Sequence, residues 1–223
     1  MPIIISIEGN IGSGKSSLID KLKTYYSNYK KCKIIFISEP IDIWKSIVDD
    51  NNNNLLNLYY QDQNKYSFPF QIMTLSSRIN QINNLINKYD IIITERSLFT
   101  DKNVFAKMLY DSKKIDSISF KIYNYLFDQF DKNYEIYYYF IDIPPDICIQ
   151  RITKRNRIEE KSVSLDYIKE CDKYHKEWLK NEKLVTINNE LNLNKMTINF
   201  FIYFKSFINY LPSAYFILKD LKE

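Results

Sequence analysis

All three glycines of this 223-residue chain lie in one octapeptide: Gly9-Asn10-Ile11-Gly12-Ser13-Gly14-Lys15-Ser16. The octapeptide follows an apolar run at 2–7 and precedes a stretch with helical spacing, so it fits the pattern G-x-x-x-x-G-K-[ST] in a strand–turn–helix context. Glycine lets the backbone curl until its N–H groups point at phosphate oxygens, and the start of a helix adds positive charge. In such a loop the lysine bridges the β- and γ-phosphates and the serine binds Mg²⁺. The sequence therefore predicts a site for ATP and magnesium.

Beyond the octapeptide, short apolar runs alternate with helical stretches. The apolar runs are β-branched or aromatic, as is typical of buried strands, and lie at 2–7, 33–37, 90–94, 136–143 and 184–187. Helical patterning occupies 15–27, 55–88 with a break near Pro69, 99–131 with a break, 145–152 and 164–182. This alternation predicts an α/β protein with a five-stranded parallel sheet flanked by helices. The length suits a single domain, 1–223.

The composition excludes several classes of protein. Hydrophobic residues make up 45% and charged residues 26%, an ordinary globular balance. The net charge of +4 is too diffuse to indicate nucleic-acid binding. Cys32, Cys148 and Cys171 show neither metal-ligand nor CxxC spacing, so we expect reduced thiols and a cytoplasmic location. The apolar start of the chain is too short for a signal peptide.

The C-terminal part is apolar and aromatic. Lys205, Asn209 and Pro212 interrupt the run at 198–218, which favours an amphipathic helix over a membrane segment. We expect this helix to begin near 194 and to end by about Tyr210, because the residue before a proline disfavours helical backbone. No membrane partner is expected.

Charged residues directly follow two of the predicted strands. Glu39 comes after the second strand, and Glu95 and Arg96 end the third. The carboxyl ends of parallel strands form the edge at which ligands bind in α/β proteins. Glu39 there is suited to accept a proton from an attacking hydroxyl, although from the residues alone a solvated loop glutamate is equally consistent.

Arginine is scarce in this chain. The other four arginines are Arg78, Arg151, Arg155 and Arg157. The last three precede a pair of glutamates in a basic-then-acidic segment that is either a solvated face or part of a functional site. The scarcity of arginine elsewhere favours a functional role. His175, the sole histidine, lies in a helical stretch and is expected to pack or cap rather than to catalyse.

Six segments in this order and spacing resemble the deoxynucleoside kinase family: IEGNIGSGKS, EPIDIW, FPFQ, ERSLFTD, RITKRNRIEE and LDYIKECDKYHKEWL. The resemblance runs from about 3 to 187, whereas 188–223 match poorly. It implies that the chain phosphorylates the 5′-hydroxyl of a deoxyribonucleoside, with ATP as donor, Mg²⁺ as cofactor and no nucleic-acid partner. It also implies the P-loop kinase fold, an arginine-rich lid at about 151–162, a divergent tail at 194–223 and a homodimer.

The resemblance implies a role for each matching residue. For catalysis, with Glu39 as general base held by Arg96, these are Glu39, Arg96, Lys15, Arg155 and Arg157. For ATP they are Gly9, Asn10, Ile11, Gly12, Ser13, Gly14, Lys15, Ser16, Ser17, Arg151 and Arg155. For Mg²⁺ they are Ser16 and Glu95. The residues implied to bind the nucleoside are Glu39, Trp44, Leu56, Tyr60, Phe70, Gln71, Arg78, Arg96, Asp101, Phe105 and Glu160. Among them, Tyr60 and Glu160 would bind the 3′-hydroxyl and Gln71 the base.

Two of these residues indicate which base is preferred. In the family, an arginine and an aspartate at the positions of Arg78 and Asp101 accompany deoxycytidine and purine deoxynucleosides rather than thymidine. Asp101, ionised and held by Arg78, can only accept hydrogen bonds, which suits an exocyclic amino group. The alternative is that this Arg–Asp pair only ties two helices together. For the activity as a whole, one alternative is a thymidylate kinase-like enzyme, but its monophosphate acceptor is an anion that Glu39 would repel. The other alternative is a non-kinase P-loop ATPase or switch.

Overall fold

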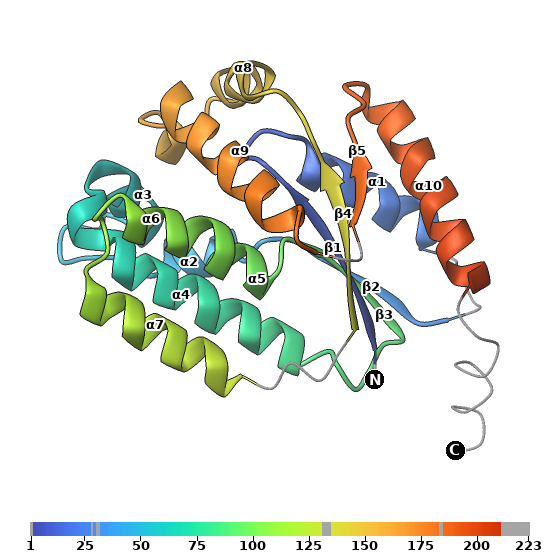
Figure 1. Ribbon diagram of the computed structural model, residues 1–223, viewed down its shortest axis with the longest axis horizontal. Helices are drawn as coiled ribbons and strands as arrows, with labels where there is room; N and C mark the ends of the chain where they lie inside the picture. Colours follow the sequence, from blue (N-terminus) through green and yellow to red (C-terminus); the bar gives the residue numbers. More distant parts are fainter. Residues whose placement is uncertain (1, 28, 30–31, 131–134, 183–184, 211–223) are drawn as a thin grey trace.

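The computed structural model describes residues 2–27, 29, 32–130, 135–182 and 185–210. These residues form a parallel sheet in the order β2-β3-β1-β4-β5 (Figure 1). The strands are β1 (Ile3–Gly9), β2 (Ile34–Ile37), β3 (Ile91–Glu95), β4 (Glu135–Ile141) and β5 (Val185–Asn188). Each overlaps the run predicted for it, so the expectation of a five-stranded parallel α/β fold is confirmed.

Helices cover both faces of this sheet (Figure 1). They are α1 (Lys15–Tyr26), α2 (Ile41–Ser46), α3 (Leu55–Gln61), α4 (Gln63–Asn83), α5 (Leu98–Thr100), α6 (Lys107–Asp111), α7 (Ser117–Gln129), α8 (Pro145–Arg155), α9 (Leu165–Leu179) and α10 (Leu193–Tyr210). A π-helical turn, Asp101–Ala106, joins α5 to α6, and a 3₁₀ turn, Ile158–Glu160, follows α8.

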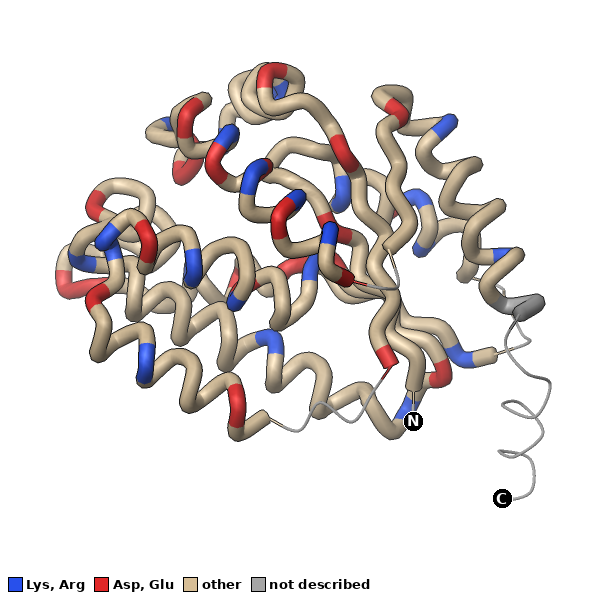
Figure 2. Tube along the Cα trace, in the orientation of Figure 1, with Lys and Arg blue, Asp and Glu red and all other residues tan. Residues whose placement is uncertain are grey.

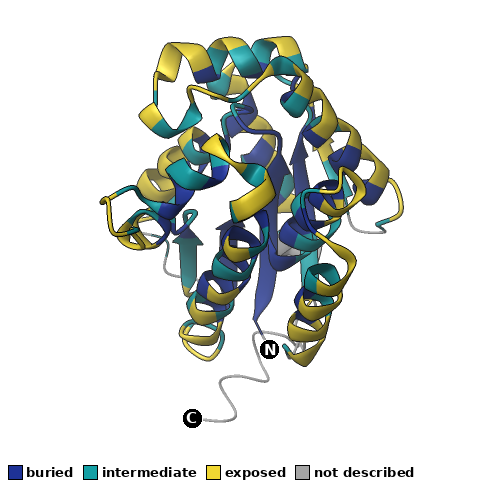
Figure 3. Cartoon of the chain, turned by 90° about the vertical axis from the view of Figure 1, so that its left-hand side faces the viewer, coloured by how far each residue is buried: buried dark blue, intermediate teal, exposed yellow. Residues whose placement is uncertain are grey.

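The central strand shows why the core has two halves. Ile3, Ile5 and Ile7 of β1 pack in a cluster with α1, α8 and α10. Ile4 points to the opposite face and packs with α4 and α7. Successive side chains of a strand alternate between faces, so an unbroken apolar strand requires helices on both sides. Figure 3 shows the result: the central strands are buried, and the helices that cover them expose their outer faces.

The strand order places a binding edge at the carboxyl end of β1. The chain passes from β1 to β2 and β3 on one side, and then crosses to β4 and β5 on the other. Such a switch in direction opens a crevice at the carboxyl ends of the central strands. The glycine-rich loop between β1 and α1 lies at this edge.

The predicted helix break near Pro69 is wrong. Helix α4 continues through Pro69, and the chain breaks instead at Asp62, between α3 and α4. Asp62 donates its backbone N–H to the Leu58 carbonyl and accepts from the N–H of Lys65, so it ends one helix and caps the next. Pro69 is exposed, and water can hydrate the carbonyl that lacks its N–H partner.

The segment predicted as a broken helix at 99–131 consists of α5, the π-helical turn, α6 and α7. The break lies at residues 112–116, and Asp116 caps α7 by accepting from the N–H groups of Ile118 and Ser119. Helix α2 was not predicted, because a six-residue helix carries too little periodicity to be recognised.

Helix α10 confirms the expected amphipathic helix. Met196, Phe200 and Phe204 are buried against the sheet cluster, whereas Ile198 and Ile202 face outward. Within the described ranges, no helix combines the length and apolarity needed to cross a membrane. The expected end of the helix before Pro212 falls outside the described residues.

Candidate active site

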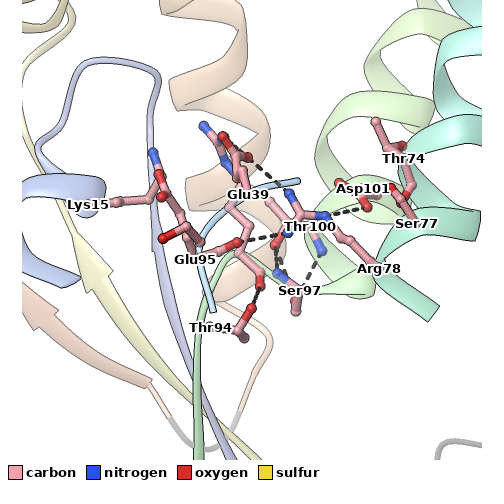
Figure 4. A network of polar contacts seen from close by, with 12 residues as sticks. Lys15, Glu39, Thr74, Ser77, Arg78, Thr94, Glu95, Ser97, Thr100 and Asp101 are labelled. Carbon is pink, nitrogen blue, oxygen red and sulfur yellow. Dashed lines mark hydrogen bonds and ion pairs between the residues drawn. The ribbon is translucent and has the colours of Figure 1, made fainter. Parts of the chain in front are cut away.

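Most charged positions are interspersed along the outer helices (Figure 2). A separate group of charged side chains is buried or nearly buried at the carboxyl edge of the sheet. Figure 4 shows several of them close together. The group consists of Lys15, Glu39, Arg78, Glu95, Arg96 and Asp101. Burying so many charges is unfavourable unless they pair, and their pairing defines the site.

The glycine-rich loop forms the first wall. Gly12 has φ +79°, and a Cβ there would lie 2.5 Å from the Cys148 carbonyl oxygen, so only glycine fits. Lys15 opens α1, and its ammonium donates to the carbonyls of Gly9 (3.0 Å) and Asn10 (2.8 Å). Burial and then the charge of Arg96 lower the pKa of Lys15 to about 8. An anion such as phosphate would restore its usual pKa.

Glu39 lies where two arginines converge. It accepts from Arg96 Nη1 (2.5 Å) and from Arg78 Nη2 (2.9 Å). Burial alone would raise the pKa of Glu39, but the charges of Arg96, Arg78 and Lys15 outweigh this effect and lower it. Glu39 is therefore held as a carboxylate in a fixed orientation.

Arg78 joins this carboxylate to a second one. Its Nε lies 2.9 Å from Asp101 Oδ2, in an ion pair whose members are both almost fully buried, and its Nη1 donates to the carbonyl of Glu95. Burial raises the pKa of Asp101 to about 6 even though the Arg78 charge opposes the increase. The pair predicted from the sequence is thus formed, and it is coupled to Glu39 through one guanidinium.

A hydroxyl and a carboxylate face each other beside the glycine-rich loop. Ser16 Oγ donates to Glu95 Oε1 at 2.9 Å. Burial, followed by the charge of Glu39, raises the pKa of Glu95. Both groups are oxygen ligands, and Mg²⁺ in phosphate sites is typically held by one or two such protein oxygens together with the phosphates. The residues present therefore fit the ion that the sequence implies.

Aromatic side chains form the opposite wall. Trp44 packs edge-on against Phe70, which stacks on Tyr59 at 4.4 Å between ring centroids. The Trp44 indole donates to Ser77 Oγ, which fixes its orientation. Buried Gln71 lies in the same wall. Flat apolar surfaces with one polar group are suited to a planar heterocycle.

The segment expected to form a lid lines one part of the site. Arg155 forms a bidentate contact with Glu160 at 2.6 Å, and Arg157 lies 3.5 Å from the same carboxylate. Arg151 donates to the carbonyls of Ser13 and Leu191, and so ties α8 to the glycine-rich loop. The three arginines are therefore brought to one end of the site.

These walls enclose a cavity of about 620 Å³, and most of the predicted residues line it. Those that do are Ile11, Gly12, Gly14, Lys15, Ser16, Ser17, Glu39, Trp44, Leu56, Tyr60, Phe70, Gln71, Arg78, Glu95, Arg96, Asp101, Phe105, Arg151, Arg155, Arg157 and Glu160. Gly9, Asn10 and Ser13 lie in the loop but not on the cavity wall.

The sequence of this chain matches those of known proteins. The model of one protein family, described as deoxynucleoside kinase, matches residues 5–210. The chain belongs to the deoxynucleoside kinase family. It is 34% identical over 180 residues to a probable deoxycytidine kinase of fowlpox virus, across 78% of this chain and 71% of that protein. It is 29% identical over 205 residues to human deoxycytidine kinase, across 82% of this chain and 77% of that protein.

A solved structure shares the fold. The deoxyadenosine kinase of M. mycoides, solved with dCMP and dCDP as products, superposes with a TM-score of 0.76 at 22% identity. The match covers 91% of this chain and 99% of that one. The resemblance read from the sequence is confirmed, and the chain is an enzyme of the deoxynucleoside kinase family.

Sequence reasoning missed part of this kinase site. The additional residues on the cavity wall are Asp20, Ile41, Lys45, Tyr59, Thr74, Lys154, Glu159, Tyr167, Leu191, Leu193 and Met196. Lys45 of α2 pairs with Glu159 at 2.6 Å, so the short helix contacts the lid segment. Tyr59 and Tyr167 join their hydroxyls at 2.9 Å. Nothing in the local pattern marks Lys45 or Tyr59, because their contacts depend on long-range folding.

His175 packs in the core, as predicted. It is fully buried, with Nδ1 2.7 Å from the Cys171 carbonyl, and its ring packs edge-on against Phe105 and stacks on Phe140. Burial and then the charge of Arg96 lower the pKa of His175 to about 3. It is therefore neutral at physiological pH.

Proposed function

We propose that this kinase transfers the terminal phosphoryl group of ATP to the 5′-hydroxyl of a deoxyribonucleoside, yielding a deoxynucleoside monophosphate. The observation that carries the proposal is the position of Glu39, a carboxylate held by two arginines between the glycine-rich loop and the aromatic wall. A hydroxyl placed between Glu39 and a phosphate bound at the loop would be aligned for in-line attack.

The proposed chemistry is mainly positioning and neutralisation of charge. Glu39 would accept the hydroxyl proton as the oxygen–phosphorus bond forms, and Arg96 would keep the carboxylate directed at that oxygen. The lowered pKa of Glu39 keeps it ionised and able to accept a proton, and a weak base suffices where the transition state is loose. Lys15, Arg155 and Arg157 would neutralise the negative charge on the transferred group.

ATP and Mg²⁺ would occupy the side of the cavity formed by the glycine-rich loop. Its N–H groups would bind phosphate, and Ser16 with Glu95 would hold the ion, which neutralises charge on the phosphates. We place the adenine beside Leu191, Leu193 and Met196, because these apolar side chains line the cavity next to the loop. Arg151, which donates to Leu191, would set the position of that wall.

The sugar would lie between Glu39 and the lid segment. Tyr60 and Glu160 both line the cavity there and are proposed to bind the 3′-hydroxyl. Burial, then Tyr59 and Glu160, raises the pKa of Tyr60, so its hydroxyl keeps its proton and can donate. Close contacts at the 3′ position crowd the neighbouring 2′ position, so deoxyribonucleosides should react better than ribonucleosides.

The base would lie against Trp44 and Phe70, with Gln71 as a hydrogen-bonding partner. We propose that Asp101, held by Arg78, accepts from an exocyclic amino group and so favours deoxycytidine or purine deoxynucleosides over thymidine. The names of the relatives support this preference, since they include deoxycytidine and deoxyadenosine kinases.

The test is a phosphorylation panel with ATP and Mg²⁺. It comprises deoxycytidine, deoxyadenosine, deoxyguanosine, thymidine, cytidine, dTMP and no acceptor. We expect phosphorylation of the first three, weak use of thymidine and weaker use of cytidine than of deoxycytidine. Preference for dTMP would favour the thymidylate kinase-like alternative, and hydrolysis of ATP independent of any acceptor would favour the ATPase.

We also propose a homodimer built on α7. One face of this helix packs against α4 through the buried Tyr123 and Phe127. The opposite face is also apolar and carries the exposed side chains of Ile118, Ile122 and Tyr125. An isologous pairing of two such faces would cover them. Light scattering at micromolar protein should give a dimer mass, with Ile122→Asp shifting it to a monomer. A monomeric wild type would contradict the proposal.

We also propose that the protein is located in the cytoplasm. Cys148 and Cys171 are buried free thiols, which fits a reducing compartment such as the cytoplasm.

A further inference from the structure

Arg96 has an unusual backbone. It is not glycine, yet its φ is +62°, a left-handed conformation that side chains with a Cβ rarely adopt. The Arg96 N–H donates to the Ile7 carbonyl, and the Thr94 hydroxyl donates to the Arg96 carbonyl oxygen. Such a conformation persists only where the surroundings determine it strongly. The guanidinium that contacts Glu39 is therefore directed by the backbone at the end of β3.

The next turn of the chain is fixed by a capping box. Ser97 Oγ accepts from the Thr100 N–H, and Thr100 Oγ1 accepts from the Ser97 N–H. The turn begins directly after Arg96 and ends directly before Asp101. Any group that fixes this turn therefore orients both Arg96, which is proposed to hold the general base, and Asp101, which is proposed to recognise the nucleobase.

Glu8 of β1 is the group beneath the turn. Its side chain is fully buried and does not line the cavity. It accepts from the hydroxyls of Ser6 (2.6 Å), Ser97 (3.1 Å) and Thr100 (2.7 Å to each carboxylate oxygen). Each hydroxyl has one hydrogen to donate, and the capping N–H groups already occupy acceptor positions of two of them. Burial raises the pKa of Glu8, but the hydrogen bonds from Ser6, Thr100 and Ser97 and the charge of Arg96 lower it, so these hydroxyls favour the carboxylate form.

We propose that Glu8 is a positioning residue for phosphoryl transfer, holding the Ser97–Thr100 turn and through it Arg96 and Asp101. The inference rests on the proposed function, because it assigns Glu8 to the orientation of Arg96 at Glu39. A purely structural carboxylate would change the stability of the fold but not the turnover of the folded enzyme. A positioning carboxylate changes turnover through Arg96.

The experiment is Glu8→Gln in the full chain. The amide replaces one carboxylate oxygen with an NH₂ group that faces hydroxyls donating to Glu8, so the turn should shift while side-chain volume is kept. Displacement of a catalytic group by about 1 Å can lower the rate by up to ~10²-fold. We expect kcat with deoxycytidine to fall by about tenfold or more, with KM for ATP within about twofold of wild type.

The matched control is Asp90→Asn. Asp90 is also a buried carboxylate, but it accepts from the Lys33 N–H at the opposite end of the sheet. This change should leave kcat at the wild-type value, although both substitutions are expected to lower the melting temperature. If Glu8→Gln behaves like this control, the inference is refuted.

A double-mutant cycle shows whether Glu8 acts through Arg96. In an Arg96→Lys background, Glu8→Gln should lower kcat much less than it does in wild type, since the group it positions is gone. Equal fold-losses in both backgrounds would overturn the proposal. Should Glu8→Gln fail to fold, Thr100→Val removes a donor to Glu8 from the same turn; a lowered kcat supports the inference, and a wild-type kcat refutes it.

The outcome also separates this inference from the proposed function. A wild-type enzyme that phosphorylates no deoxynucleoside refutes both. An active wild type together with a fully active, folded Glu8→Gln variant refutes only the role of Glu8.

Discussion

Replacing Asp101 by asparagine tests the proposed choice of base at the level of one oxygen atom. The Asp101 side chain is 3% exposed and 2.9 Å from Arg78 Nε. Asparagine has the same shape, so its carbonyl oxygen can remain toward Arg78 while its amide presents N–H hydrogens toward the cavity. An amino group on the base would then face a donor instead of an acceptor.

The magnitude follows from the charge of the lost acceptor. A hydrogen bond to a charged group contributes ~1.5–3 kcal/mol, which corresponds to roughly 10- to 150-fold in kcat/KM. We expect Asp101→Asn to lower kcat/KM for deoxycytidine by that factor. Thymidine, which offers a carbonyl, should lose nothing and gain modestly. The assay is competition between the two nucleosides in one reaction, so that errors in enzyme concentration cancel.

The structure shows why Arg78 is less suitable as the site of this change. Arg78 also donates to Glu39 and to the Glu95 carbonyl, so Arg78→Met should lower kcat for every nucleoside. The pair Asp101→Ala with Arg78→Met should move the preference toward thymidine, but only on a background of lower turnover. Asp101→Asn separates recognition from turnover.

A pH series supplies an independent arm. Burial raises the pKa of Asp101 to about 6, so the carboxyl is ionised above that pH and gains a proton below it. KM for deoxycytidine should therefore rise as the pH falls through about 6 in wild type, but not in Asp101→Asn. If the variant keeps the wild-type ratio of deoxycytidine to thymidine, or if wild type prefers thymidine, Asp101 does not choose the base.

Three further predictions address the rest of the site. Glu39→Gln should fold and bind nucleoside but lose about 10²–10⁴-fold in kcat, because the hydroxyl proton has no acceptor; near-normal turnover would show that Glu39 is not the base. Calorimetry with a non-hydrolysable ATP analogue should show affinity falling as the pH rises above about 8, where Lys15 loses its proton, and Lys15→Met should lack this step. The NMR signal of the sole histidine, His175, should report a neutral ring down to about pH 4. The unfolded state binds this proton near pH 6.5 and the folded state only near 3. The unfolding free energy should therefore fall by ~1.4 kcal/mol for each pH unit as the pH is lowered between these values, and a pH-independent stability there would contradict the burial of the ring.

The fold was largely predictable because its signals are local. A glycine loop between an apolar strand and a helix gives the phosphate site, and the remaining apolar runs give the strands. Helix boundaries were less predictable. Pro69 is a strong breaker in sequence, but its effect depends on whether the freed carbonyl faces water. Asp62 ends α3 and begins α4 with a side chain that also suits an ordinary surface position.

The composition of the site was predictable only where spacing could be matched to a family. Glu39, Arg96 and Asp101 stand in motifs, and the structure brings them together around Arg78. Lys45 stands in no motif, and its contact with Glu159 forms only when the folded chain brings α2 to the lid segment. The left-handed conformation of Arg96 gave no signal either, because glycine, the usual marker, is absent from that turn.

The position of Arg78 has a consequence for how this site would discriminate between substrates. One guanidinium contacts Asp101, which faces the proposed base, and Glu39, which faces the proposed hydroxyl. If a nucleobase offers Asp101 no donor, the carboxylate would interact more strongly with Arg78. The ion pair between Arg78 and Glu39 would then weaken or change its geometry. Discrimination would then appear in the transition state as well as in binding, since the orientation of the carboxylate is needed when the proton moves. Poor substrates should thus lose kcat as well as affinity, which an isolated base pocket would not produce.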